Sequence, residues 1–111
     1  MTISVRGHHL RISVPLKAYA ERRLLFAIGS FGSRVSDVEI RVADVNGPRG
    51  GVDKTCVITA VLRPVGRIVA RAAHSNAYSA IDRAASRIRA VLVRRLQRLR
   101  TPRRTDRRHF G

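Results

Sequence analysis

The chain has 111 residues, which suits one compact domain and leaves little room for a second. Hydrophobic residues make up 44% of it, enough for one modest core, so a chain that is disordered throughout is excluded. The 23 Lys and Arg against seven Asp and Glu give a formal net charge of +16, well beyond the roughly 2–8 units that solubility asks of a small domain, and indicate an anionic partner such as nucleic acid.

The N-terminal part of the chain predicts a strand followed by a helix. Residues 2–6 alternate apolar and polar side chains, as a strand does, and Gly7 is expected to end it. Ser13 is a good N-cap, and a helix should run from it to about Ile28. The buried stripe of this helix is predicted to consist of Leu16, Ala20, Leu24 and Ala27.

Three strands are predicted next. Residues 37–42, 55–62 and 67–72 each alternate with a period of two. Residues 46–51, Asn-Gly-Pro-Arg-Gly-Gly, could cradle a phosphate through backbone N–H groups. Because this segment lacks the Gly-Lys-Ser/Thr ending of a P-loop and opens no helix, we favour a plain hairpin loop.

The last predicted element is a long helix from Ala77 to Leu99, capped by Ser75 or Asn76. Residues 101–111 are expected to form a disordered basic tail after a domain of residues 1–100. The element order β-α-β-β-β-α favours a parallel crossover between the first two strands and antiparallel neighbours after it. The predicted fold class is therefore α+β, with a four-stranded sheet and both helices packed on one face.

One flank of the last helix concentrates positive charge. At 100° per residue its apolar residues share one arc, and a neighbouring arc of about 60° holds four residues, here termed the arginine ridge: Arg83, Arg87, Arg94 and Arg98. No acidic residue lies among them, although a solvated helix face ordinarily interleaves Glu at i,i+4. We expect RNA phosphates to lie along this ridge.

Other basic residues are candidates for the same RNA-binding surface. The last helix adds Arg95, and the first helix adds Lys17, Arg22 and Arg23. Tyr19 could be either a stacking ring for a base or a core residue, and both interpretations stay open. Phe26 could also extend the RNA-binding surface, but we favour a place at the edge of the core.

Signals for catalysis are poor. His8 and His9 are expected to point apart, and Cys56 lies in the buried register of a strand, which is typical of an inert core thiol. With no carboxylate pair or metal-ligand spacing, we expect no enzyme, catalytic residue, metal, cofactor or small-molecule substrate. No secretory signal or membrane span is apparent, and one Cys fits a reducing compartment, so we expect a cytoplasmic protein without a membrane partner.

Residues 76–88 resemble the second helix of the ribosome hibernation-promoting factor family, whose members are also known as ribosome-associated inhibitors or ribosomal subunit interface proteins. That helix opens with Asp-Met-Tyr-x-Ala-Ile-Asp and continues to a Lys-Leu pair. Matching positions here are Tyr78, Ala80, Ile81, Asp82 and the pair Arg87-Ile88. The segment Ile3-Ser4-Val5-Arg6-Gly7, followed by Ile12, Leu16, Tyr19 and Leu24, also fits, so the resemblance covers residues 2–99. Departures from the family pattern are Asn76 and Ala77 in place of Asp and Met, and Phe26 and Ala90 in place of basic residues.

The resemblance implies a domain related in shape to double-stranded-RNA-binding domains. It implies binding to rRNA at the decoding region of the small ribosomal subunit, where the protein blocks mRNA and tRNA and stores idle ribosomes as a stress response. Basic family positions map onto Lys17, Arg23, Arg87 and Arg94. The chain ends without the extra C-terminal domain of long members, so we expect a short form that is monomeric off the ribosome. The alternative hypothesis is a general RNA- or DNA-binding architectural protein without ribosome specificity.

Overall fold

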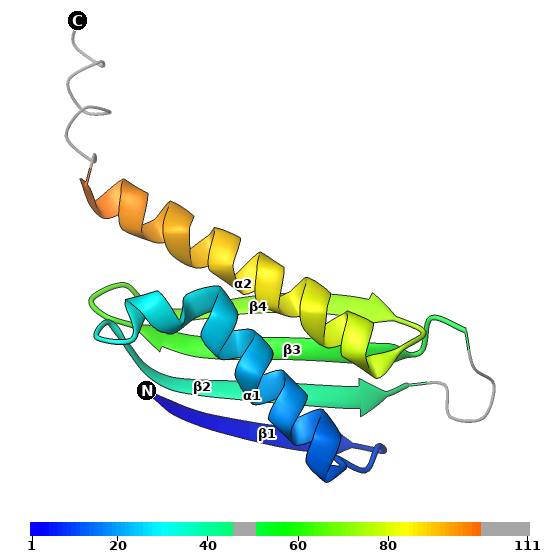
Figure 1. The fold of residues 1–111 in the computed structure, drawn as a ribbon. Coiled ribbons are helices and arrows are strands. Elements are labelled where there is room, and N and C mark those ends of the chain that lie inside the picture. Colours follow the sequence, from blue (N-terminus) through cyan, green and yellow to red (C-terminus); the bar gives the residue numbers. More distant parts are fainter. Residues whose placement is uncertain (46–50, 101–111) are drawn as a thin grey trace, which may run out of the picture.

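The computed structural model describes residues 1–45 and 51–100. The element order is the predicted one: β1 (Thr2–His8), α1 (Val14–Ile28), a short 3-10 helix η1 (Gly29–Phe31), β2 (Val35–Asp44), β3 (Lys54–Leu62), β4 (Gly66–His74) and α2 (Ala77–Arg100). Both helices cover the same face of the sheet (Figure 1), so the α+β class is confirmed. The predicted tail and most of the predicted phosphate loop lie outside the described residues.

The four strands form one mixed sheet in the order β1-β2-β3-β4. β1 runs parallel to β2, with Ile3 opposite Val38, whereas β2, β3 and β4 are antiparallel, with Ile40 opposite Ile58. This arrangement confirms the predicted crossover through α1 and the predicted antiparallel neighbours. Because side chains alternate along a strand, this register places the apolar set of every strand on the face that the helices cover.

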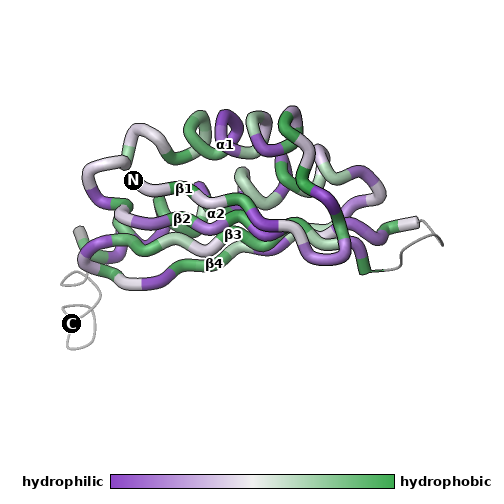
Figure 2. The backbone as a smooth tube through the Cα atoms, turned by 90° about the horizontal axis from the view of Figure 1, so that it is seen from below, coloured by the Kyte–Doolittle hydropathy of each residue, from purple (hydrophilic) through white to green (hydrophobic). Residues whose placement is uncertain are grey.

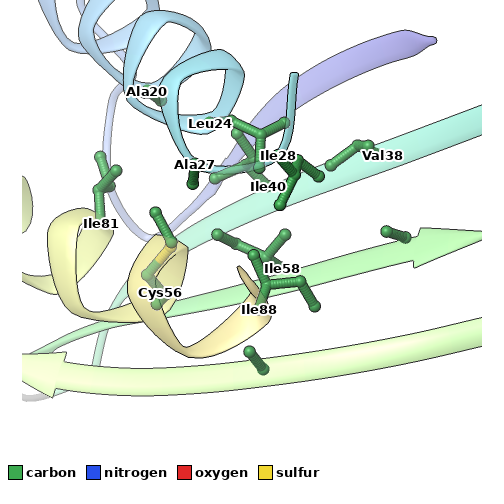
Figure 3. Close-up of a cluster of buried hydrophobic side chains, with 14 of the residues drawn as sticks. Ala20, Leu24, Ala27, Ile28, Val38, Ile40, Cys56, Ile58, Ile81 and Ile88 are labelled. Atoms are coloured by element: carbon green, nitrogen blue, oxygen red, sulfur yellow. The ribbon is translucent and has the colours of Figure 1, made fainter. Parts of the chain in front are cut away.

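The core lies between that face and the two helices. Figure 3 shows Leu24 and Ile28 of α1 and Ile88 of α2 gathered around Ile40 of β2 and Ile58 of β3. All four predicted stripe residues of α1 are buried. Figure 2 shows α1 as a layer on one side of the strands, which leaves the opposite face of the sheet without a covering element among the described residues.

Side chains cap both helices at their N-termini. The hydroxyl of Ser13 accepts from the backbone N–H of Leu16 at 3.2 Å, as expected of an N-cap. Asn76 caps α2, because its Oδ1 accepts from the backbone N–H groups of Tyr78 (2.8 Å) and Ser79 (3.3 Å). Of the two predicted caps of α2, Asn76 is therefore the one that acts.

Two predictions at the end of β1 are wrong. Gly7 does not end the strand but pairs with Val42 inside it. The chain turns back so closely that a Cβ on Gly7 would lie 2.1 Å from the carbonyl oxygen of Leu10, which explains the glycine better than strand termination does. His8 and His9 do not point apart, because His9 adopts a left-handed backbone (φ 55°) that brings the two rings edge to face at 4.2 Å.

Candidate nucleic-acid interface

The arginine ridge runs along the flank of α2 beside the free edge of β4. All four of its side chains are exposed. Arg83 donates from Nη1 to the carbonyl oxygen of Ala73 (3.4 Å), and Arg87 donates from Nη1 to that of Arg71 (2.5 Å). These two residues thus cover backbone acceptors of an edge strand. Because a carbonyl is neutral, the bonds orient the guanidinium groups without cancelling their charge.

No acidic side chain pairs with the ridge in residues 1–45 and 51–100. The ion pairs found there involve other cations: Arg6 and Arg41 with Glu39, Arg23 with Asp82, and Lys54 with Asp44 and Asp53. The side chains of Arg94 and Arg98 make no hydrogen bond to another described residue. The ridge is thus a row of exposed positive charges without an acidic partner in the part of the chain that the structure describes, as the sequence pattern indicated.

Asp82 joins the two helices. Its Oδ1 accepts from the hydroxyl of Tyr19 at 2.6 Å and lies 3.2 Å from Nε of Arg23. Arg23 also donates to Oγ of Ser86 at 3.0 Å. The hydrogen bond to the Asp82 carboxylate, helped by burial, raises the pKa of Tyr19 above its ordinary value.

This contact decides between the two interpretations of Tyr19. Its ring is half buried and packs edge to face against Tyr78, with the centroids 5.0 Å apart. A ring held in this way connects the helices and packs against the core, so the core interpretation is confirmed.

The remaining predicted RNA-binding residues are dispersed. Arg22 is exposed, with its guanidinium 5.9 Å from the Tyr19 ring centroid. Lys17 is exposed about 120° around α1 from Arg23, at 100° per residue. Arg95 is half buried and falls within the apolar arc of α2. The structure therefore gathers the ridge on one flank, whereas Lys17 lies apart from it, and RNA contacts by all of these residues stay predictions.

The sequence reasoning missed a groove between the helices. It is lined by Arg23, Phe26, Ala27, Ser86 and Arg89, and is here termed the Phe26 groove. The expectation that Phe26 sits at the edge of the core is wrong: 85% of the residue is exposed, because α2 packs beside this flank of α1 without covering it.

Arg89 forms the opposite wall of the groove. It donates to the carbonyl oxygen of Ala27 at 2.8 Å and lies 5.6 Å from the Phe31 ring centroid. The i, i+4, i+7 spacing of Asp82, Ser86 and Arg89 is a signal that could have identified this polar flank of α2.

The positions of Cys56 and of the potential metal ligands bear on the expectations about catalysis. Cys56 is fully buried, so its predicted place in the core is confirmed, and desolvation raises the pKa of its thiol to about 12. Among the described residues, no three His, Cys, Asp or Glu side chains come together as a metal site. None of the described helices is long and apolar enough to cross a membrane.

Comparison with known proteins identifies the family. The model of the family described as Sigma 54 modulation protein / S30EA ribosomal protein matches residues 3–100. The chain belongs to this family. The family consists of ribosome-associated proteins, which confirms the resemblance seen in the sequence of α2 and its surroundings. No curated protein sequence matches the chain significantly.

Solved structures support the same fold. A ribosomal subunit interface protein from Coxiella burnetii superposes with a TM-score of 0.74 at 22% identity, covering 87% of this chain and 99% of that one. The N-terminal domain of Protein Y from Thermus thermophilus superposes with a TM-score of 0.69 at 22% identity, covering 85% and 98%. The S30EA family fold thus accounts for nearly the whole length of both relatives.

Proposed function

We propose that this chain binds the small ribosomal subunit at its decoding region, clamps rRNA phosphates with the arginine ridge and keeps mRNA and tRNA from an idle ribosome. The observation that carries the proposal is the row of four exposed guanidinium groups without an acidic partner in the described part of the chain. Membership of the S30EA family supplies the ribosome as the partner. The printed name of the Coxiella relative, a ribosomal subunit interface protein, supports a site between the subunits.

The mechanism needs charge and shape rather than base sequence. Each guanidinium offers five N–H donors in a planar fork that matches a phosphate. In Arg83 and Arg87 one nitrogen already donates to β4, which fixes the direction of the rest. The 24-residue helix can therefore lie along folded rRNA, and the volume of the domain excludes mRNA and tRNA from positions that no side chain contacts.

The test is binding to purified small subunits over a range of salt concentrations. Arg94→Glu with Arg98→Glu should abolish binding, because the ridge then presents negative charges to the RNA phosphates. The variant should still fold, since both residues are exposed and their side chains have no bonded partner among the described residues. A matched control changes two exposed arginines of the open sheet face, Arg67→Glu with Arg71→Glu, and alters the net charge by the same amount. It should bind nearly as the unmodified protein does.

Salt dependence distinguishes phosphate clamping from other attachment. Neutral replacements, Arg94→Gln with Arg98→Gln, should make the log–log slope of affinity against salt shallower by about 1.8, from two phosphates at about 0.9 each. If the Glu variant binds small subunits as tightly as the control, the arginine ridge is not the contact surface and the proposal fails. Competition between the protein and mRNA or tRNA on the same subunits tests occlusion directly.

A further inference from the structure

We propose that the Phe26 groove is a nucleobase-binding site, in which an unpaired RNA base stacks on the ring of Phe26 between two anchored guanidinium groups. This inference deepens the proposed ribosome binding and rests on it, because the base belongs to the RNA whose phosphates lie on the arginine ridge. It adds a contact that phosphate clamping does not require.

The first support is the exposure and setting of the ring. Phe26 is 85% exposed, and the guanidinium of Arg23 lies 5.7 Å from the ring centroid. A single exposed apolar side chain is ordinary on a protein surface, so exposure alone decides nothing. Here, however, the ring stands in a hollow walled by two guanidinium groups, Arg23 paired with Asp82 and Arg89 without an acidic partner among the described residues, a combination that suits an aromatic ligand attached to an anionic backbone.

The second support is that both walls are held in place. Arg23 is fixed by Asp82 and Ser86 on the opposite helix, and Arg89 by the carbonyl oxygen of Ala27. Since their positions are set before a ligand arrives, little side-chain freedom is lost on binding. Among the described residues Arg89 has a neutral acceptor and no acidic partner, so its charge is available to a phosphate or to a base edge.

The third support is continuity between the groove and the arginine ridge. A second hollow on α2 shares Ser86 and Arg89 with the Phe26 groove and extends past Ala90 to Arg94 of the ridge. Ala90 is exposed and small, so RNA can approach the helix closely between the two sites. A strand whose phosphates lie on the ridge can thus place a base across α2 into the groove. This path favours RNA over an apolar protein segment as the occupant.

The experiment compares variants of Phe26 for binding to small subunits. Phe26→Ala should weaken binding about 5- to 150-fold, as loss of one stacked base does, with an unchanged log–log salt slope because no charge is removed. Phe26→Leu keeps an apolar side chain without an aromatic face and should be similarly weak. Leu25→Ala, at a neighbouring half-exposed position on another side of α1, is the control and should bind normally. Far-UV circular dichroism checks that every variant is folded.

A fluorescence reading identifies the ligand as a base. The chain contains no tryptophan, so Phe26→Trp introduces a single indole in the groove. It should retain affinity, and its emission should be quenched when small subunits or a single-stranded oligoadenylate is added at low salt.

The outcomes separate this inference from the proposed function. Normal binding by Phe26→Ala or by Phe26→Leu, or unquenched indole emission in the bound complex, overturns the base site while ribosome binding stands. If the unmodified protein does not bind small subunits, the proposed function fails, and the oligoadenylate titration still decides whether the groove stacks a base.

Discussion

The hydrogen bond between Tyr19 and Asp82 should contribute measurably to the stability of the domain. A hydrogen bond to a charged group contributes about 1.5–3 kcal/mol, and the 2.6 Å distance is that of a strong one. The Arg23–Asp82 pair, with side chains 23% and 43% exposed, adds only about 0.2–1 kcal/mol because solvent screens it. Alanine is the better helix former by up to about 0.7 kcal/mol. Asp82→Ala should therefore destabilise the domain by roughly 1–3 kcal/mol.

The assay is urea unfolding followed by far-UV circular dichroism, arranged as a double-mutant cycle. Tyr19→Phe removes the hydroxyl and keeps the ring against Tyr78, so its coupling with Asp82→Ala isolates the hydrogen bond. We expect a coupling energy of about 1–2 kcal/mol at an unchanged m value. Tyr78→Phe is the control and should alter stability by less than about 0.5 kcal/mol. A coupling energy below about 0.5 kcal/mol would refute the role given to this contact.

Three further predictions follow from single contacts. Gly7→Ala should destabilise the domain by about 1–3 kcal/mol or more, because the new Cβ meets the Leu10 carbonyl oxygen. Gly29→Ala should stabilise the domain by about 0.4–1 kcal/mol, because Gly29 has right-handed helical geometry and its Cβ would meet nothing nearer than 3.9 Å. A higher melting temperature for Gly7→Ala than for Gly29→Ala would contradict this. Cys56 should react with a thiol reagent only as the protein unfolds, and rapid labelling of the folded protein would show that the thiol is accessible. Folding raises the pKa of Tyr19, so the stability that its protonated hydroxyl contributes should be complete below pH 10.0, the ordinary pKa, and lost as the pH rises through the higher folded pKa. The difference in unfolding free energy between the unmodified protein and Tyr19→Phe should therefore shrink only in that alkaline range.

The sequence could predict the features that local geometry determines. Helical periodicity alone assigns Leu24 to the core and Arg87 and Arg94 to the exposed flank of α2, because both follow from 100° per residue. Alternation similarly gives the strands, and short connections give their antiparallel pairing. The element order and the arginine ridge therefore needed no tertiary information.

The sequence could not predict features that depend on where a second helix or strand lies. Whether the flank of α1 that carries Phe26 is covered depends on how far α2 lies from it, which periodicity does not contain. The sequence predicts that Gly7 ends the strand, because nothing in it indicates that Leu10 folds back over this glycine. Likewise, the place of Arg89 in the Phe26 groove depends on its hydrogen bond to the carbonyl oxygen of Ala27, near the end of the other helix.

Three arginines of the proposed RNA-binding surface are oriented in the same way. Arg83, Arg87 and Arg89 each donate to a backbone carbonyl oxygen, and a neutral acceptor orients a cation without offsetting its charge. The free domain therefore keeps the mutual repulsion of these groups, and under the proposed function the RNA polyanion is what relieves it. Added salt should consequently act in opposite directions on two measurements: it screens the repulsion and stabilises the unbound domain, while it weakens binding to RNA by reducing the gain from counterion release.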